Sequence, residues 1–390
     1  MIEASAESGF TKQLSYGMVG GGPGSFIGDV HRKSINLDGL ARITAGCFSQ
    51  SPEKTLETGK SLGLDNERLY KSYGEMAEAE SKRPDKIDFV VIVTPNTSHY
   101  AIAKAFLSRG IPVVCDKPLC TEESEAKELA ELAKQKKLPF MVTYTYTGNV
   151  TVRQMRAMIK KGEIGKILFV NAEYPQEWLL APAEKQGNKQ AVTRTDPALA
   201  GKANCVGDLG SHVENMVSYL TGLKIKKVLA RLDSIGEGRV LDDNATIMLE
   251  YEGGAKGVYW TSQIAAGGDN PFRVRIFGSK GALDWNEENC NYIQVYPFGQ
   301  PKFTLSRGRD AFAAQASSLS RIPSGHPEGY FESLANIYKV YINALIKLKA
   351  GQTPGGDDLD FPDVEMGAEG VKFIGKCVES SQKGSVWVNF

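Results

Sequence analysis

The sequence predicts an α/β protein of two domains. Residues 1–146 are expected to form a doubly wound parallel sheet, and residues 147–390 an α+β domain on a mostly antiparallel open sheet. The chain has 390 residues, more than an average single domain. Strand and helix patterns alternate up to residue 146, and strand-like runs with turn residues dominate after it. A glycine-rich turn, Gly20 to Gly24, joins the first strand pattern to the first helix pattern.

The first domain consists of repeated strand–helix units, which implies right-handed crossovers between parallel strands. Strands are expected over residues 15–19, 41–49, 87–94, 111–115 and 139–146, and helices over residues 27–36, 52–62, 98–109 and 121–137. The run over residues 87–94 is rich in β-branched side chains, as expected for a strand buried on both faces. Thr121 is expected to cap the N-terminus of its helix.

The sequence pattern of the second domain is richer in strands. We expect a helix over residues 152–161, a strand over 167–178, and an antiparallel hairpin of residues 244–251 and 255–264. A second strand pair is expected over residues 272–277 and 282–285, and helices over 330–348 and 363–379. The C-terminal helix is expected to pack back on the first domain. Residues 182–202 and 308–328 are polar and irregular, and loops of that length tend to be functional, so we expect them to set specificity.

Composition excludes several classes of function. The formal net charge is zero, and no basic surplus points to nucleic acid. Residues 1–13 lack the apolar core of a signal peptide, and no apolar run is long enough to span a bilayer. The six cysteines are scattered without a C-x-x-C pair. This pattern favours reduced thiols in a cytoplasmic protein, with no structural metal site.

The glycine turn has the composition of a site for a dinucleotide pyrophosphate. Glycine allows positive φ and close approach of the backbone, and the free N–H groups and helix dipole attract the anion. Two registers are possible, one ending at Ser25 and a looser one from Gly22 to Gly28. The position between a strand and a helix, at the start of a strand–helix series, supports this interpretation. The expected cofactor contacts here are Gly20, Gly22, Gly24, Ser25, Phe26 and Ile27.

The end of the second strand usually carries an acid for the adenosine ribose, but here that acid is missing. Ser49 stands about where it would be. A serine can bind a ribose hydroxyl and does not repel a 2′-phosphate, and Lys54 either helps a phosphate to bind or is simply solvated. The choice between NAD and NADP therefore stays open.

Two later strands end in polar residues at the edge where an open α/β sheet binds its ligand. Thr94, Pro95 and Asn96, with His99 just beyond, follow one strand, and Asp116 and Lys117 follow the next. Pro118 restricts the backbone of Lys117 to extended geometry. All six residues from Thr94 to Lys117 named here are expected to lie at the cofactor. His31, by contrast, is expected to be structural.

Asp208 and His212 are four residues apart, so on a helix they share a face. A carboxylate beside an imidazole orients it, and an imidazole can take the proton of a hydroxyl as hydride leaves. The alternative is a structural pair in the core. For His326, lining a sugar pocket and capping the next helix are equally open. Tyr144, Tyr146 and Trp178 are candidate substrate contacts or core aromatics.

Together these motifs resemble the glucose–fructose oxidoreductase/inositol dehydrogenase/MocA (Gfo/Idh/MocA) family, whose first domain is a Rossmann fold. The resemblance covers almost the whole chain and rests on residues 20–28, 94–96 with 99, 116–118, Arg194 in Thr-Arg-Thr-Asp-Pro, and 207–212. It implies that Lys117, Asp208 and His212 meet around the nicotinamide and the substrate carbinol, with Arg194 also at the substrate. It further implies a homodimer or homotetramer through the second domain's open sheet. The chain departs from the family pattern at Asp116, where glutamate is usual, at the longer loop over residues 23–26, and at Ser49.

The sequence thus predicts reversible hydride transfer between NAD or NADP and a secondary hydroxyl of a sugar, glycoside or cyclitol. His212 would be the base, Asp208 would orient it, and Lys117 would hold the hydroxyl. Asn96 and Asp116 would hold the nicotinamide ribose. One alternative is an NAD-dependent glycosidase, in which transient oxidation, elimination and addition cleave a glycoside without net redox change. Another is a sensor of NAD(P) or sugar without turnover.

Overall fold

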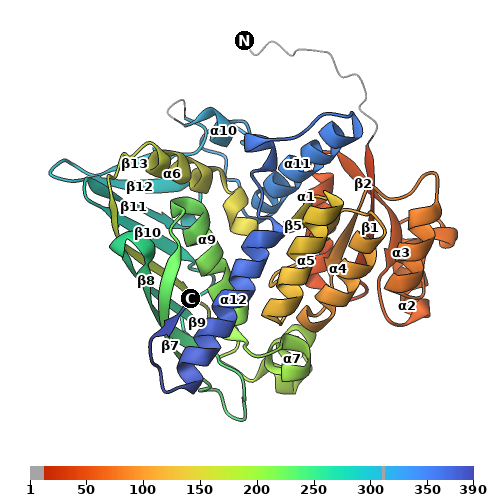
Figure 1. Cartoon of the computed structure of the whole chain (residues 1–390), viewed down its shortest axis with the longest axis horizontal. Helices are drawn as coiled ribbons and strands as arrows, with labels where there is room; N and C mark the ends of the chain where they lie inside the picture. Colours follow the sequence, from red (N-terminus) through yellow and green to blue (C-terminus); the bar gives the residue numbers. More distant parts are fainter. Residues whose placement is uncertain (1–12, 310–311) are drawn as a thin grey trace.

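The computed structural model describes residues 13–309 and 312–390, which form two sheets with helices between them (Figure 1). The first sheet is parallel, with strand order β2-β1-β3-β4-β5. The second has nine strands in the order β13-β12-β11-β10-β6-β9-β8-β7-β14 and is antiparallel except where β6 pairs with β9. The predicted fold class is confirmed. The expectations for residues 1–12 lie outside the described residues.

The first sheet is built from short strands buried by helices on both sides. Its strands are β1 (Leu14–Gly20), β2 (Ala41–Cys47), β3 (Phe89–Val93), β4 (Val113–Cys115) and β5 (Phe140–Val142). Its helices are α1 (Phe26–Asn36), α2 (Pro52–Ser61), α3 (Tyr73–Lys82), α4 (His99–Ser108) and α5 (Glu123–Lys136). All five residues of β3 are buried, as the β-branched run predicted.

Three details of this domain differ from the prediction. Helix α3 was not expected. The cap expected at Thr121 is wrong, because α5 begins at Glu123 and the residue before it, Glu122, forms no side-chain cap. Strand β5 ends at Val142 instead of 146, because residues 145–148 turn into a short 3₁₀ helix.

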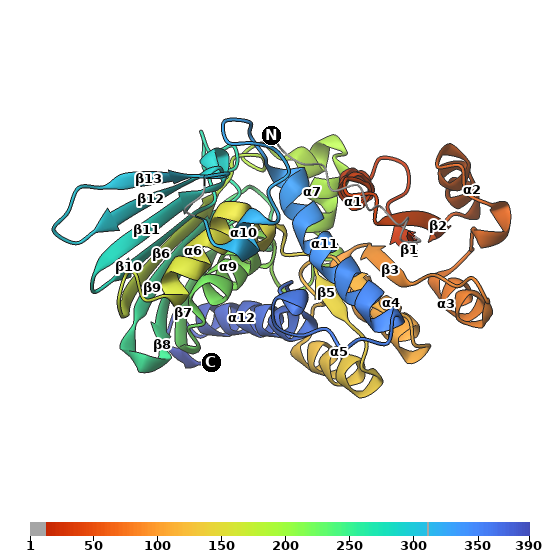
Figure 2. The ribbon, with the colours of Figure 1, turned by 90° about the horizontal axis from the view of Figure 1, so that it is seen from above.

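The second sheet carries its helices on one face. In Figure 2, α6 (Val150–Lys160), α9 (Ser211–Thr221) and α12 (Val364–Gln382) lie on the side that faces the first sheet, and the opposite face carries no helix. Five strands match predicted ones: β6 (Ile167–Pro175), β8 (Asn244–Tyr251), β9 (Lys256–Ser262), β10 (Arg273–Gly278) and β11 (Gly281–Asn286). Four were not predicted: β7 (Ile225–Asp233), β12 (Tyr292–Pro297), β13 (Phe303–Ser306) and β14 (Val388–Asn389).

The last two long helices pack against the first sheet. Leu334, Ile337 and Tyr341 of α11 (Tyr330–Lys349) share one buried cluster with Tyr16 and Phe89 of β1 and β3. Helix α12 packs along α5, with Val364 and Val371 in the cluster on the other side of the sheet. The backbone N–H of Val142 in β5 also donates to the carbonyl of Pro362, at 2.9 Å. The C-terminal segment therefore completes the core of the first sheet.

The two segments expected to be irregular contain short helices. Residues 182–202 hold α7 (Lys189–Thr195) and α8 (Pro197–Ala200), and the described part of residues 308–328 holds α10 (Ala314–Ser317). All six cysteines are buried and none is paired. Over residues 13–309 and 312–390, none of the helices combines the length and the apolar character that crossing a bilayer requires.

Candidate active site

A cavity of about 1070 Å³ lies between the two sheets. The first domain contributes the glycine turn and the strand-end loops, and the second contributes α7, the start of α9 and the end of β6. Among the sequence-predicted site residues, the following line it: Gly22, Gly24, Ser25, Phe26, Ile27, Ser49, Lys54, Thr94, Pro95, Asn96, Asp116, Lys117, Tyr146, Trp178, Arg194, Asp208 and His212.

The glycine turn presents bare backbone to this cavity at the start of α1. A Cβ added to Gly22 would lie 2.7 Å from the carbonyl oxygen of Phe48, so no side chain fits there without movement. Ser25 caps α1 by accepting a hydrogen bond from the N–H of Gly28, at 3.2 Å. A Cβ on Gly28 would lie 2.4 Å from the Cα of Gly21, so this glycine allows the helix to approach the strand. The turn thus fits a dinucleotide pyrophosphate, with Gly28 as its last glycine.

A buried charge cluster surrounds Asp208. Its Oδ1 lies 2.5 Å from the Lys117 Nζ and 2.8 Å from Nη2 of Arg194, and its Oδ2 accepts from Nε2 of Gln263 at 3.0 Å. Burial alone would raise the pKa of Asp208, but the Arg194 and Lys117 cations outweigh it and hold that pKa below its usual value. Burial lowers the pKa of Lys117 despite the attraction of Asp208. The cluster keeps an ionised carboxylate next to a lysine that donates hydrogen bonds.

The position of Asp208 follows from the local backbone. A π-helical turn (Val206–Gly210) leads directly into α9 and places Asp208 and His212 at the same cavity. The carboxylate of Asp242 fixes the start of this turn by accepting from the N–H groups of Asn204 and Val206, both at 2.7 Å. Asp208 forms no hydrogen bond with His212, since its two oxygens are bound by Lys117, Arg194 and Gln263. The expected direct orientation of the imidazole by this carboxylate is therefore not seen.

Aromatic rings hold His212 instead. The edges of Tyr144 and Tyr146 meet the imidazole at centroid distances of 5.8 and 5.0 Å, and Tyr174 lies at 6.3 Å. The hydroxyls of Tyr146 and Tyr174 are hydrogen-bonded to each other at 2.5 Å. Burial lowers the pKa of His212 well below its usual value, and the Lys117 cation lowers it further. The imidazole is therefore neutral at pH 7 and able to accept a proton.

Four expected contacts lie outside the cavity. Gly20 packs closely against β3, because a Cβ there would lie 2.7 Å from the Val93 carbonyl oxygen, so only glycine fits at the start of the turn. His99 is buried and ties two loops together through the carbonyls of Pro118 and Thr94, at 2.9 and 2.8 Å. Tyr144 is buried in the core cluster of the first sheet, and its ring meets the imidazole of His212 edge-on.

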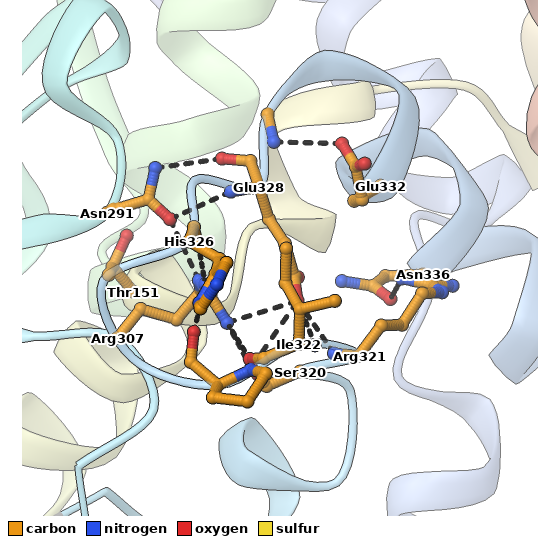
Figure 3. A network of polar contacts seen from close by, with 12 residues as sticks. Thr151, Asn291, Arg307, Ser320, Arg321, Ile322, His326, Glu328, Glu332 and Asn336 are labelled. Atoms are coloured by element: carbon orange, nitrogen blue, oxygen red, sulfur yellow. Dashed lines mark hydrogen bonds and ion pairs between the residues drawn. The ribbon is translucent and has the colours of Figure 1, made fainter.

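The fourth, His326, is exposed and does neither of the two things expected of it. Helix α11 is capped at Gly329, whose N–H donates to the carboxylate of Glu332 at 2.9 Å. The backbone carbonyl of His326 accepts from Arg307, and Figure 3 shows this arginine in a network that also includes Glu328. His31, expected to be structural, is buried against the hydroxyl of Tyr338, at 2.6 Å.

The two irregular segments have different roles. Residues 188–194 contribute Asn188, Lys189, Gln190, Thr193 and Arg194 to the cavity wall. No described residue of the 308–328 segment lines it, so the structure does not support the expectation that this segment sets specificity. Ionic contacts hold this segment in place instead. Arg307 binds Glu328 at 3.0 Å, as Figure 3 shows. Arg321 also binds Asp38 of the first domain at 3.0 Å.

Sequence reasoning missed several wall residues in the second domain: Tyr174, Gln176, Lys189, Asn270, Glu287 and Tyr330. Tyr174 and Gln176 stand at the end of β6, the others come from separate loops or helix starts, and none belongs to a motif with a fixed spacing. The irregular segment at 182–202 was the one signal that pointed to Lys189.

The fold and the cavity define an oxidoreductase with an NAD-binding domain, and comparison with known proteins gives its family. Residues 14–144 match the model described as "Oxidoreductase family, NAD-binding Rossmann fold", and residues 152–284 match the "GFO/IDH/MocA C-terminal domain". The chain therefore belongs to the Gfo/Idh/MocA oxidoreductase family.

Similar proteins cover nearly the whole chain. The "Uncharacterized oxidoreductase YfiI" of Bacillus subtilis is 37% identical, and the match covers 97% of this chain and 98% of that protein. A solved inositol dehydrogenase homolog from Azotobacter vinelandii with NAD⁺ superposes with a TM-score of 0.93 at 37% identity, covering 97% of both chains. A structure of a homolog from the same organism holds NADH and myo-inositol (TM-score 0.90, 35% identity, 97% and 98% covered). A levoglucosan dehydrogenase with NADH and L-sorbose is more distant (TM-score 0.82, 26% identity, 97% and 99% covered).

Proposed function

We propose that this protein transfers hydride reversibly between NAD and a secondary hydroxyl of a sugar, glycoside or cyclitol. The observation that carries the proposal is that the glycine turn and the polar cluster of Lys117, Asp208 and His212 line a single cavity. The solved relatives support the substrate class, because they hold NADH together with myo-inositol or with L-sorbose.

The residues of the first domain suit the parts of the cofactor in order along the cavity. The turn at Gly22 and Gly24 would hold the pyrophosphate, and Ser49 the adenosine ribose. Asn96 and Asp116 would hold the nicotinamide ribose. Asp116 is fixed for this role, since its Oδ1 accepts from the Thr143 hydroxyl at 2.6 Å and from the N–H of Lys117 at 3.0 Å. The bound nicotinamide supplies the hydride acceptor.

His212 of the second domain and Lys117 of the first domain act on the substrate hydroxyl. His212 accepts the hydroxyl proton on its neutral imidazole, while the Lys117 ammonium donates a hydrogen bond to the same oxygen and stabilises its developing negative charge. Asp208 keeps Lys117 in place through two hydrogen bonds, from Nζ to its Oδ1 and to its backbone carbonyl at 2.5 and 2.9 Å. In the reverse direction His212 returns the proton to the carbonyl oxygen.

Replacement of His212 with glutamine tests this role. Loss of a general base typically lowers the rate by about 10²–10⁴-fold, so kcat for the best substrate should fall by that factor while the Kd for NADH stays unchanged. His326→Gln is the matched control, because His326 is exposed and outside the cavity. Near-normal turnover by His212→Gln would refute the assignment.

The substrate itself requires a screen of sugars, glycosides and cyclitols with NAD⁺ and NADP⁺, followed by absorbance of the reduced cofactor. We expect stoichiometric formation of NADH, and a lower kcat/KM with NADP⁺. Cleavage of a glycoside in large excess over NAD without lasting NADH would instead establish the redox-neutral glycosidase reaction.

We also propose that the helix-free face of the second sheet binds a second copy of this chain. Six large apolar or aromatic side chains that point to this face are at least about one third exposed: Phe169, Met248, Trp260, Phe277, Tyr292 and Tyr296. Monomeric proteins rarely expose apolar patches of this kind. Light scattering after size-exclusion chromatography should give a dimer or tetramer mass, and a monomer mass at micromolar concentration would refute the proposal.

A further inference from the structure

Glu287 is a carboxyl group in the cavity wall that the hydride-transfer mechanism does not use. It begins the turn after β11, and its backbone N–H donates to the carbonyl of Phe272 at 2.8 Å, so the main chain is held at this point. The Oε2 atom is fully buried and has no hydrogen-bond partner. A buried polar atom without a partner is costly, and such a group calls for an explanation.

The surroundings of Glu287 contain aromatic hydroxyls. Tyr146, Tyr174 and Tyr330 line the same cavity as Glu287. Burial raises the pKa of all three hydroxyls, and the Glu287 carboxyl adds to each shift when it is ionised. Within residues 13–309 and 312–390, no ion pair joins Glu287 to a lysine, arginine or histidine, and burial is the only influence on its pKa. Burial raises the pKa of Glu287 to about 8. At neutral pH the group is mainly a carboxylic acid, which can both donate and accept a hydrogen bond.

The wall beside it is also polar and fixed. Oδ1 of Asn270 accepts from the Tyr174 hydroxyl at 2.8 Å and from Nε2 of Gln176 at 2.6 Å. The Asn270 N–H donates to the Glu288 carboxylate at 3.0 Å. These contacts hold rigid polar groups and ring faces around one end of the cavity, an arrangement that suits a compact ligand with several hydroxyls.

The charges of the cavity select a neutral ligand. Lys117 and Arg194 contribute two positive charges, and Asp208 and Asp116 contribute two negative charges, so the formal charges beside His212 cancel. Glu287 is mainly an uncharged acid at neutral pH, so it offers a charged substituent no opposite charge. A polyol needs no opposite charge, because hydroxyls are neutral and both donate and accept.

We infer that Glu287 recognises a hydroxyl of the substrate other than the one that is oxidised, and so selects neutral polyhydroxylated rings. The inference rests on the proposed function, since it concerns the substrate of the same cavity. It makes Glu287 a specificity residue: its hydrogen bond forms on binding and is not needed for the proton or hydride step.

The test compares Glu287→Leu and Glu287→Gln with wild type, using myo-inositol, levoglucosan and their monodeoxy analogues as probes. A lost hydrogen bond to a buried acid corresponds to about a 10–100-fold rise in KM for Glu287→Leu, with kcat within a few-fold and the Kd for NADH unchanged. Glu287→Gln should recover part of the loss, because an amide also donates and accepts. Glu252→Leu, on the exposed turn between β8 and β9, is the control.

The deoxy analogues identify the hydroxyl. One analogue should bind wild type as weakly as its parent binds Glu287→Leu, and should lose nothing further in that variant. Unchanged KM and unchanged analogue selectivity in both variants, with wild type active, would overturn the inference alone. An aminocyclitol that binds wild type more tightly than its parent, through Glu287, would overturn the preference for neutral ligands. Absence of turnover with every polyol in wild type would instead refute the proposed function, and this inference with it.

Discussion

Replacing Asp208 with asparagine removes the one negative charge from a buried cluster that holds two positive charges. The side chains of Lys117, Asp208 and Arg194 are 10%, 9% and 20% exposed. At an effective dielectric constant of about 20, unit charges 2.8 Å apart attract by about 6 kcal/mol, and desolvation of the carboxylate offsets much of this. Breaking a buried pair typically costs about 3–5 kcal/mol. We expect about 3 kcal/mol, because Lys117 can relieve the remaining repulsion by losing its proton.

The dependence on pH gives a second signature. The folded-state pKa of Asp208 lies below its unfolded value, so its stabilising effect is fully present above the unfolded pKa of about 4 and is lost as pH falls through the folded pKa. Wild type should therefore exceed Asp208→Asn in free energy of unfolding by the full amount at pH 7. The gap should narrow progressively below pH 4.

Urea unfolding at pH 7, 5, 4 and 3 measures both quantities. Asp357→Asn is the control, because that carboxylate is exposed on the short helix before α12. A destabilisation below about 1 kcal/mol at pH 7, or a gap that stays constant down to pH 3, would show that Asp208 is not held as a buried, paired anion.

Two further variants test the electrostatics of the cavity. Lys189→Ala should raise the Kd for NADH by about 2–5-fold at low salt and less at high salt, because the Lys189 Nζ lies 3.6 Å from the Cβ position of Gly24 in the pyrophosphate turn. Fluorescence titration measures this Kd, with the exposed Lys185→Ala as control. A Kd for Lys189→Ala equal to that of the control would contradict the prediction. Arg194→Met removes a cation that lowers the pKa of His212, so the acid limb of kcat/KM for alcohol oxidation should move to higher pH. A pH–rate profile at the same position as that of wild type would show that the Arg194 charge does not affect the protonation of His212.

The fold was predictable where the sequence pattern is strong. The β-branched run of β3 and the glycine turn before α1 each define their element locally. Prediction from the sequence failed where contacts between distant segments determine the secondary structure. Strands β12 and β13 at the edge of the second sheet carry several exposed aromatic residues, so no clean alternation marks them. Thr121 has the chemistry of a cap, but the helix begins two residues later.

The candidate site shows the same division. Lys117, Asp208 and His212 stand in compact motifs, and the structure brings all three to one cavity. His99 belongs to such a motif too, yet it is buried behind the loops, because spacing along the chain does not tell which way a ring points. Glu287 could not be found in this way, since it reaches the cavity only because β11 pairs with β10 in the second sheet.

The packing of α11 and α12 has a consequence for synthesis of the chain. A nascent chain emerges N-terminal end first, and domains generally fold as units in that order. Here the cluster around Tyr16 and Phe89 also needs Ile337 and Tyr341, and the edge strand β5 is bonded by Pro362. Part of the apolar surface of the first, cofactor-binding domain therefore stays exposed until the last sixty or so residues leave the ribosome. Its folding is tied to completion of the whole polypeptide.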